Sequence, residues 1–328
     1  MLARISKIFR PAVFQGKNQS GNYFEGWFYK LVDESRKNVC AFIPGIYIDK
    51  NEQNSHAFIQ MLDNPRHDSS YLHFPLEQFE ASNRNLYIKI GDNIFTDRML
   101  SISLKTDHGP IAGTVKFDGL NPWPVSILSP GIMGWYAYVP FMECYHGVVS
   151  LDHRLHGSLE LHDRTIDFSK GRGYIEKDWG KSFPSAYLWI QSNHFQKIGT
   201  SLMVSVAKIP WLSGSFRGFI IGLLTDGTLH RFTTYNGAQL NFLKIDDATV
   251  HLEVQNRNYK LSLAAKRTTG GILHAPYKTK MQRVSETLNS TVDIQLIRHN
   301  ASSDKLVFEG QGAAAGLDVN GKLEEIIG

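Results

Sequence analysis

Apolar and polar residues alternate one for one in many short segments of this 328-residue chain. The segments 86–90, 101–105 and 250–254 each follow this pattern. Successive side chains of a β-strand point to opposite faces of its sheet, so the alternation predicts strands with one buried face. Asp-Gly and Asn-Gly pairs, at 226–227 and 236–237, are typical of the turns between such strands. The pattern predicts an all-β protein of antiparallel sandwiches or barrels.

Two pairs of similar strings indicate an internal duplication. AFIPGIYIDK at 41–50 is similar to GFIIGLLTDG at 218–227, and NRNLYIKI at 83–90 is similar to NRNYKLSL at 256–263. The two pairs have nearly the same offset along the chain and keep their order. They predict two β units of similar plan.

We place the first of these β units at residues 1–165 and the second at residues 166–328. Before the last strands of the first unit lies Asn121–Trp135, NPWPVSILSPGIMGW, which is rich in proline and glycine. This composition predicts a long irregular crossing. Loops of this length in a compact domain are usually functional or cover another part of the molecule.

Composition and charge exclude several classes of protein. A hydrophobic content of 42% is that of a globular chain. The formal net charge of +4 is not gathered into a lysine and arginine block, so we expect no nucleic-acid partner. Two cysteines, Cys40 and Cys144, are too few for a secreted disulfide scaffold. The longest apolar run, near 219–224, is much shorter than the ~20 residues of a membrane-spanning helix. We expect a soluble cytoplasmic protein.

The N-terminal string MLARISKIFRPAVF is basic but lacks the apolar core of a signal peptide. Its apolar residues recur near helical spacing beside basic ones. These residues are Leu2, Ile5, Ile8 and Phe9, with Arg4, Lys7 and Arg10. A frayed amphipathic end is the expected interpretation, and peripheral contact with a membrane surface is the alternative.

The string GNYFEGWFYK, at 21–30, places a carboxylate among aromatic rings. In a strand, one face would carry Tyr23, Glu25, Trp27 and Tyr29. Two interpretations stay open. The segment is either an edge strand with Glu25 in solvent, or a strand whose Glu25 face lines a cavity.

The string GYIEKDWGKSFP contains two acids, Glu176 and Asp178, which would share one strand face with Tyr174. Two carboxylates this close repel each other when both are ionised. In a dry pocket one of them holds its proton, because burial and a like charge both raise a carboxyl pKa. The alternative is that Lys177 and nearby basic groups neutralise the two acids at the surface.

The segment 134–163 is rich in histidine. It contains His146, His153, His156 and His162. Metal ligands on one strand would lie two residues apart, and neither this spacing nor a zinc signature occurs, so no metal site is expected. The alternation directs His156 and His162 to solvent and leaves the environments of His146 and His153 open.

Three strings together resemble the tocopherol cyclase family: GNYFEGWFYK, GWYAYVPFMECYHGVVSLDH and GYIEKDWGKSFPSAYLWIQSNHF. The resemblance is specific from about Gly21 to Phe195 and looser over the rest of the chain. It implies two lipocalin-like β units packed around an apolar cleft, with a distant similarity to carotenoid hydratases. Family members related to the plant enzyme cyclise a prenylated hydroquinone to a chromanol. The motif positions are Glu25, Trp27, His146, His153, Glu176, Asp178, Trp179 and Asn193.

We therefore expect an isomerase that protonates an alkene and closes a phenol onto the resulting cation. A carboxylic acid in a low-dielectric pocket stays neutral at pH 7 and can deliver its proton there. We expect Asp178 to be this acid, with Glu176 and Glu25 as alternatives and His146 as the base. No metal or other cofactor is expected. Aromatic faces would stabilise the cation by ~2 kcal/mol each. The expected residues that bind the apolar prenylated substrate are Trp27, Tyr29, Tyr136, His153, Trp179, Trp189 and Asn193.

Two other functions fit the same rings. A lipocalin-like carrier would bind an isoprenoid without chemistry. An alkene hydratase would add water to the double bond. The pair Glu176 and Asp178 beside Trp179 favours an enzyme, because a carrier has little reason to bury acids.

Overall fold

The computed structural model describes residues 7–17, 19, 21–50, 52–66, 68–277, 280–300 and 303–327. Of the N-terminal segment considered for membrane contact, Leu2, Arg4 and Ile5 lie outside the described residues. The chain divides into two compact units. The first is Met1–Phe183 with Gly271–Arg283, and the second is Pro184–Gly270 with Val284–Gly328. In the described part of the chain, no helix is both long and apolar enough to cross a bilayer.

The first unit contains an antiparallel sheet of twelve strands. The strands are β1 (Tyr23–Val32), β2 (Val39–Ile48), β3 (His56–Asp63), β4 (Asp68–Phe74), β5 (Phe79–Ala81), β6 (Tyr87–Ile90), β7 (Asn93–Thr96), β8 (Met99–Thr106), β9 (Gly109–Asp118), β10 (Cys144–Leu161), β11 (Arg164–Asp167) and β12 (Arg172–Gly180). Short 3-10 helices are η1 (Glu52–Asn54), η2 (Asn64–Arg66), η3 (Leu76–Gln78) and η4 (Gly134–Tyr138). Strand β20 (Gly271–Tyr277) lies beside β3, where the Gln60 Nε2 donates to the His274 carbonyl oxygen at 2.9 Å.

The second unit contains an antiparallel sheet of its own. Its strands are β13 (Ala186–Ser192), β14 (Ser201–Trp211), β15 (Gly214–Thr225), β16 (Thr228–Thr233), β17 (Gln239–Ile245), β18 (Thr249–Gln255), β19 (Tyr259–Lys266), β21 (Lys280–Arg298) and β22 (Lys305–Gly321), with η5 (Thr234–Asn236) and α2 (Glu324–Ile327). The predicted all-β antiparallel fold is confirmed. Within the described residues each sheet is an open path, from β4 to β5 and from β16 to β17.

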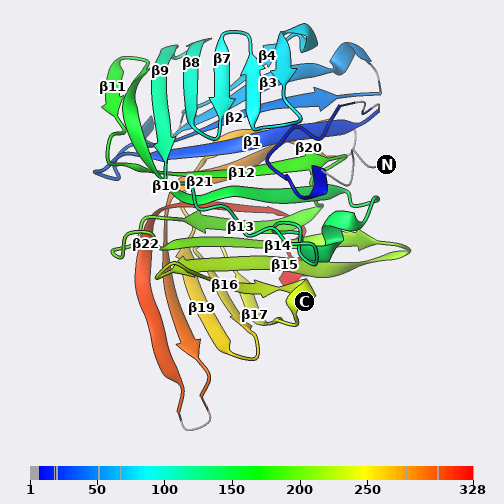
Figure 1. Ribbon diagram of the computed structural model, residues 1–328, viewed down its shortest axis with the longest axis vertical. Helices are drawn as coiled ribbons and strands as arrows, with labels where there is room; N and C mark the ends of the chain where they lie inside the picture. The colour runs from blue at the N-terminus through cyan, green and yellow to red at the C-terminus, as the bar shows by residue number, and fades with distance from the viewer. Residues whose placement is uncertain are drawn as a thin grey trace. The chain divides into compact units, whose positions relative to one another are not determined.

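The second sheet repeats the strand order of the first, without counterparts of β6 and β5. The first runs β4-β3-β2-β1-β12-β10-β9-β8-β7-β6-β5, and the second runs β16-β15-β14-β13-β22-β21-β19-β18-β17. In each, the last strand of the unit returns to lie beside its first strand: β12 beside β1, and β22 beside β13. Figure 1 shows the blue β1 and the green β12 next to each other. Two β units of similar plan are therefore present.

The strings that indicated the duplication do not occupy equivalent strands. The segments 41–50 and 218–227 fall on β2 and β15, but β15 takes the place that β3 has in the first sheet. Likewise β6 and β19, which carry the second pair of strings, hold different places in their sheets. Turn-plus-strand strings recur wherever hairpins follow one another, so their similarity does not fix which strands correspond.

The units divide after Phe183, whereas the sequence suggested a division after residue 165. The difference concerns β12, which we had assigned to the second unit. This strand pairs on one side with β1, where Trp27 faces Lys177, and on the other with β10, where His146 faces Asp178. It therefore completes the first sheet.

Each sheet has one face on an apolar core. In the first unit Trp27, Tyr29, Phe42, Phe95 and Phe168 are fully buried on that face. Burying a side chain of this kind stabilises the fold by roughly 1.5–3 kcal/mol. The opposite face of β12 does not pack on this core and carries a polar cluster.

Candidate active site

Strand β12 carries the two acids of the candidate site. Alternation places Tyr174, Glu176 and Asp178 on the face turned away from the core. Since β12 lies between β1 and β10, cross-strand neighbours hold these side chains from both sides. His146 of β10 lies directly opposite Asp178, and Gly26 of β1 lies opposite Asp178 on the other side.

The imidazole of His146 lies between two carboxylates. Its Nδ1 is 2.7 Å from the Asp178 Oδ1, and its Nε2 is 3.5 Å from the Glu176 Oε2. The Tyr174 hydroxyl donates to the same Glu176 oxygen at 2.6 Å. The side chains of Glu176, His146 and Asp178 are 6%, 13% and 24% exposed, so Asp178 is the most accessible of the three.

The electrostatics of this cluster keep a proton on it at neutral pH. Burial lowers the pKa of His146, but the negative charges of Asp178 and Glu176 and the hydrogen bond to Asp178 outweigh this and raise the pKa to about 9. Burial, together with the charge of Glu176, raises the pKa of Tyr174 well above its usual value. Tyr174 therefore remains a hydrogen-bond donor. The protonated imidazole of His146 therefore lies in hydrogen-bond contact with Asp178 and within ion-pair distance of Glu176.

An aromatic wall lies on the same sheet face as Asp178. Phe24 shares this face of β1 with Gly26, and it packs with Tyr47 and Phe58. The Phe183 ring stacks on Phe24 with centroids 5.0 Å apart. The half-buried thiol of Cys144 belongs to the same group, and its Sγ is 4.0 Å from the Asp178 Oδ1. Alternation along the chain did not predict this wall, although Phe24 and Phe28 flank Gly26 in the string that contains Glu25.

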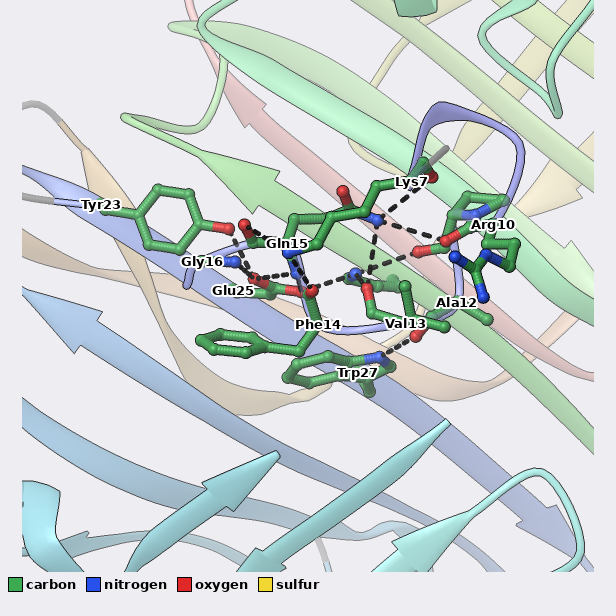
Figure 2. Close-up of polar contacts among 12 residues, drawn as sticks. Lys7, Arg10, Ala12, Val13, Phe14, Gln15, Gly16, Tyr23, Glu25 and Trp27 are labelled. Atoms are coloured by element: carbon green, nitrogen blue, oxygen red, sulfur yellow. Dashed lines mark hydrogen bonds and ion pairs between the residues drawn. The ribbon is translucent and has the colours of Figure 1, made fainter. Parts of the chain in front are cut away.

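Glu25 lies on the other face of the sheet, in a closed network. Its side chain is fully buried, and its Oε1 is 2.6 Å from the Lys177 Nζ. The Tyr23 hydroxyl donates to it at 2.5 Å, and the backbone N–H groups of Gln15 and Gly16 each donate at 2.8 Å. Figure 2 shows Glu25 surrounded by these groups of the N-terminal segment. The structure does not bring Glu25 to the cluster of His146, and it places β1 inside the sheet instead of at an edge.

Lys177 links Glu25 to the N-terminal segment and to two tryptophan rings. Its Nζ donates to the backbone oxygens of Pro11 and Val13 at 2.9 and 2.6 Å. The same atom is 4.8 Å from the centroid of Trp27 and 4.5 Å from that of Trp179. These two rings therefore already contact a cation supplied by the protein.

Of the other residues expected to bind substrate, two aromatic residues lie in the first unit, and two residues lie in the second unit. Tyr29 is buried in the core, and its hydroxyl donates to the Thr96 carbonyl oxygen at 3.1 Å. Tyr136 lies in η4 and stacks on Trp135. Trp189, on β13, and Asn193, directly after it, belong to the second unit.

His153 is also away from the cluster. Its ring is 1% exposed and packs on Phe117 of the core, and its Nδ1 is 3.1 Å from the Ser150 Oγ. Burial and the charge of Arg172 lower the pKa of His153 to about 3. His153 is therefore a neutral core histidine. His156 is exposed, as the alternation predicted, whereas His162, for which the same was expected, is half-buried.

Two groups of side chains in the described residues have donor atoms close enough to hold a metal ion. They are His146, Glu176 and Asp178, and Asp63, Asp68 and His162. In each group the donor atoms lie within 4.8 Å of one another. An imidazole nitrogen with two carboxylate oxygens is a set that divalent cations accept. Spacing along the sequence could not reveal the first group, because His146 reaches Asp178 across two neighbouring strands.

Comparison with known proteins identifies the family. The model of the tocopherol cyclase-like family matches residues 120–321. The probable chloroplastic tocopherol cyclase of Oryza sativa subsp. japonica is 22% identical over 197 residues, a match that covers 57% of this chain and 42% of that protein. The matched part of the chain thus spans less than half the length of the rice protein.

Two solved structures share the fold. CghA, solved with Sch210972, has a TM-score of 0.57 and 11% identity, and the match covers 92% of this chain and 89% of CghA. A putative AttH from Nitrosomonas europaea has a TM-score of 0.54 and 12% identity, over 93% of this chain and 94% of that one. The two units are thus lipocalin-like β folds. Since the family model covers more than half of the chain, the protein belongs to the tocopherol cyclase-like family.

Proposed function

We propose that this member of the tocopherol cyclase-like family is an acid catalyst of the cyclase kind, which closes a prenylated phenol or hydroquinone to a chromanol. Membership of the family supports a cyclase- or hydratase-type enzyme. The observation that carries the proposal is the His146 imidazole held between the Asp178 and Glu176 carboxylates, beside an aromatic wall. Such a cluster can give a proton to an apolar substrate and take one back.

The first step is protonation of the alkene by Asp178. At neutral pH the proton rests on the imidazole of His146, in contact with Asp178. An apolar substrate that covers the cluster excludes water, and a low dielectric disfavours separated charges. The proton then moves to the Asp178 carboxylate. The O–H bond of Asp178 breaks, a C–H bond forms on the less substituted alkene carbon, and the other carbon becomes a tertiary cation.

The second step is ring closure. The phenol oxygen attacks the tertiary cation and forms a C–O bond, and the phenol proton returns to the cluster through Asp178 or His146. Product and substrate are isomers, so no oxidant or reductant is consumed. Phe24, Tyr47 and Phe58 would stabilise the cation through their ring faces, by up to about 2 kcal/mol each when desolvated. Glu176, fixed by Tyr174, holds His146 in its protonated form.

The test is incubation of the purified protein with a synthetic prenylated hydroquinone, followed by mass spectrometry of the extract. A cyclase gives a chromanol of unchanged mass that has lost one hydroxyl group reactive to acetylation. A product heavier by one water would identify an alkene hydratase. Recovery of unchanged hydroquinone, bound to the protein, would identify a carrier, and either of these results would overturn the proposal.

A further inference from the structure

Asp318 of the second unit has the same place in its sheet as the acids of β12 have in theirs. It lies on β22, which pairs with the first strand of the unit as β12 does. In the register, Asp318 faces Trp189 of β13 and Glu286 of β21. Its neighbour Leu317 belongs to the apolar core, so Asp318 points to the opposite sheet face. The carboxyl group is therefore held on the non-core face, as Asp178 is in the first unit.

One carboxyl oxygen of Asp318 is buried without a partner. The residue is 5% exposed, and its Oδ2 accepts a hydrogen bond from the Tyr187 hydroxyl at 2.6 Å. The Oδ1 has no hydrogen-bond partner among the residues that the structure describes. Buried polar atoms of native proteins almost always have a hydrogen-bond partner, so this oxygen is a candidate contact for a bound molecule.

A flat ring lies beside this carboxyl group. Trp189 is 8% exposed, and its ring lies directly against Gly316, two residues before Asp318 on the same face. A Cβ on Gly316 would lie 2.5 Å from the ring, so only glycine permits this approach. The tryptophan ring, the carboxyl group and the tyrosine hydroxyl thus lie on one face of the sheet, on the neighbouring strands β13 and β22.

We propose that Asp318, Tyr187 and Trp189 form a ligand-binding site of the second unit, in which the Asp318 Oδ1 donates a hydrogen bond to a carbonyl or hydroxyl oxygen of an aromatic molecule lying against Trp189. The site is independent of whether the His146 cluster performs catalysis.

The protonation state of Asp318 suits this role. Burial raises its pKa to about 7, although the hydrogen bond from Tyr187 acts in the lowering direction. The titratable groups that face it are Tyr187 from β13 and Glu286 from β21. A carboxylic acid is a donor only while it keeps its proton. Ligands that need this donor should therefore bind better below the pKa than above it.

The experiment compares two probes of the same ring skeleton by calorimetry on the full chain. Menadione carries two carbonyl oxygens and 2-methylnaphthalene carries none. For the wild-type protein, we expect menadione to bind about tenfold or more weakly at about pH 9 than at about pH 6, and 2-methylnaphthalene to bind equally at both. Asp318→Asn keeps an N–H donor but cannot titrate, so its affinity for menadione should be high at both pH values. Asp318→Leu should bind the two probes alike.

Three results would each overturn the proposal. The first is equal, pH-independent binding of both probes to the wild-type protein. The second is an Asp318→Asn variant that keeps the wild-type pH profile, since another group would then be titrating. The third is no binding of menadione up to about 1 mM. Because Asp318→Asn is nearly isosteric, these comparisons hold even where Asp318→Leu fails to fold.

Discussion

Three consecutive ionisable residues of β12, Glu176, Lys177 and Asp178, point to opposite faces of the sheet and have different charge partners. On the core face, Lys177 is paired with the fully buried Glu25, which also accepts three further hydrogen bonds. On the other face, Glu176 and Asp178 share a single imidazole. In the first arrangement both carboxylate oxygens of Glu25 have partners. The second has two carboxylates around one imidazole, so the acids outnumber the base.

The two faces also shift pKa values in opposite directions. Burial lowers the pKa of Lys177 to about 8, with the charge of Glu25 acting against it. On the other face the carboxylates outweigh burial and raise the pKa of His146 to about 9. Glu25 thus fastens the N-terminal segment to the sheet, while Asp178 shares His146 with Glu176 and is the more accessible of the two acids.

The largest expected effect is that of Asp178→Asn on turnover. Removing a general acid costs typically about 10²–10⁴-fold in rate, and the amide keeps the size of the side chain. We expect cyclisation of a prenylated hydroquinone to fall by this factor while the variant stays folded. Asp118→Asn, an exposed acid of the same sheet, is the matched control and should keep full activity. A wild-type rate in the Asp178 variant would contradict the claim that the acids of this face, unlike Glu25, act in turnover.

Glu25→Gln should have the converse effect. It leaves the buried ammonium of Lys177 without its counter-charge, and breaking a buried ion pair costs about 3–5 kcal/mol of unfolding free energy. Denaturant titration measures this loss, and the folded fraction should keep a turnover within a few-fold of wild type. Glu34→Gln, which removes an exposed contact with Lys170, should leave stability unchanged. Loss of turnover without loss of stability in the Glu25 variant would show that Glu25 takes part in the chemistry.

The third prediction concerns pH. The folded pKa of His146 lies above its ordinary value of 6.5, so the stability it contributes is fully present below about pH 6.5 and is lost as the pH rises through about 9. Lys177, whose pKa is lowered, changes stability in the opposite sense above about pH 8. The difference in unfolding free energy between the wild type and His146→Gln isolates the histidine and should shrink across this window. A difference in unfolding free energy that stays constant from pH 6.5 to 9 would contradict the raised pKa of His146.

The smallest expected effect separates two buried tyrosines. Tyr174→Phe removes the hydrogen bond to Glu176, which is worth about 1.5–3 kcal/mol because the acceptor is charged, and should slow turnover by roughly tenfold. Tyr29→Phe removes a hydrogen bond to the Thr96 backbone on the core face and should lower stability by about 1 kcal/mol without affecting turnover. Steady-state kinetics and denaturant titration measure the effects in both variants. Equal effects of the two substitutions would contradict a difference in function between the two faces.

Part of this site could be predicted from the sequence. The strand period of two places Tyr174, Glu176 and Asp178 on one face, and the structure agrees. Alternation also predicted which residues of β1 share the face of Glu25. It could not tell which face of β1 coincides with which face of β12, because a one-residue change of register exchanges them. Trp27 is opposite Lys177, so Glu25 lies with the lysine and not with the acids.

Sequence spacing could not predict the partner of Asp178 either, because strand register decides which residues meet. His146 is 32 residues away and meets Asp178 only because β10 and β12 are neighbours in a particular register. Tyr47, Phe58 and Phe183 come from separate segments, so no local pattern could assemble them into one aromatic wall with Phe24. The expected division after residue 165 differs from the observed one after Phe183 because β12 pairs with β1. Sequence periodicity does not encode this long-range pairing.

Cyclisation of a prenylated hydroquinone in D₂O tests most directly whether the His146, Asp178 and Glu176 cluster delivers the proton. A proton delivered from this cluster exchanges with solvent before the alkene receives it. We expect a chromanol with one carbon-bound deuterium, beside the carbon that bears the ring oxygen, and no such product from Asp178→Asn. A chromanol without deuterium, or equal yields from the two proteins, would contradict this role of the cluster.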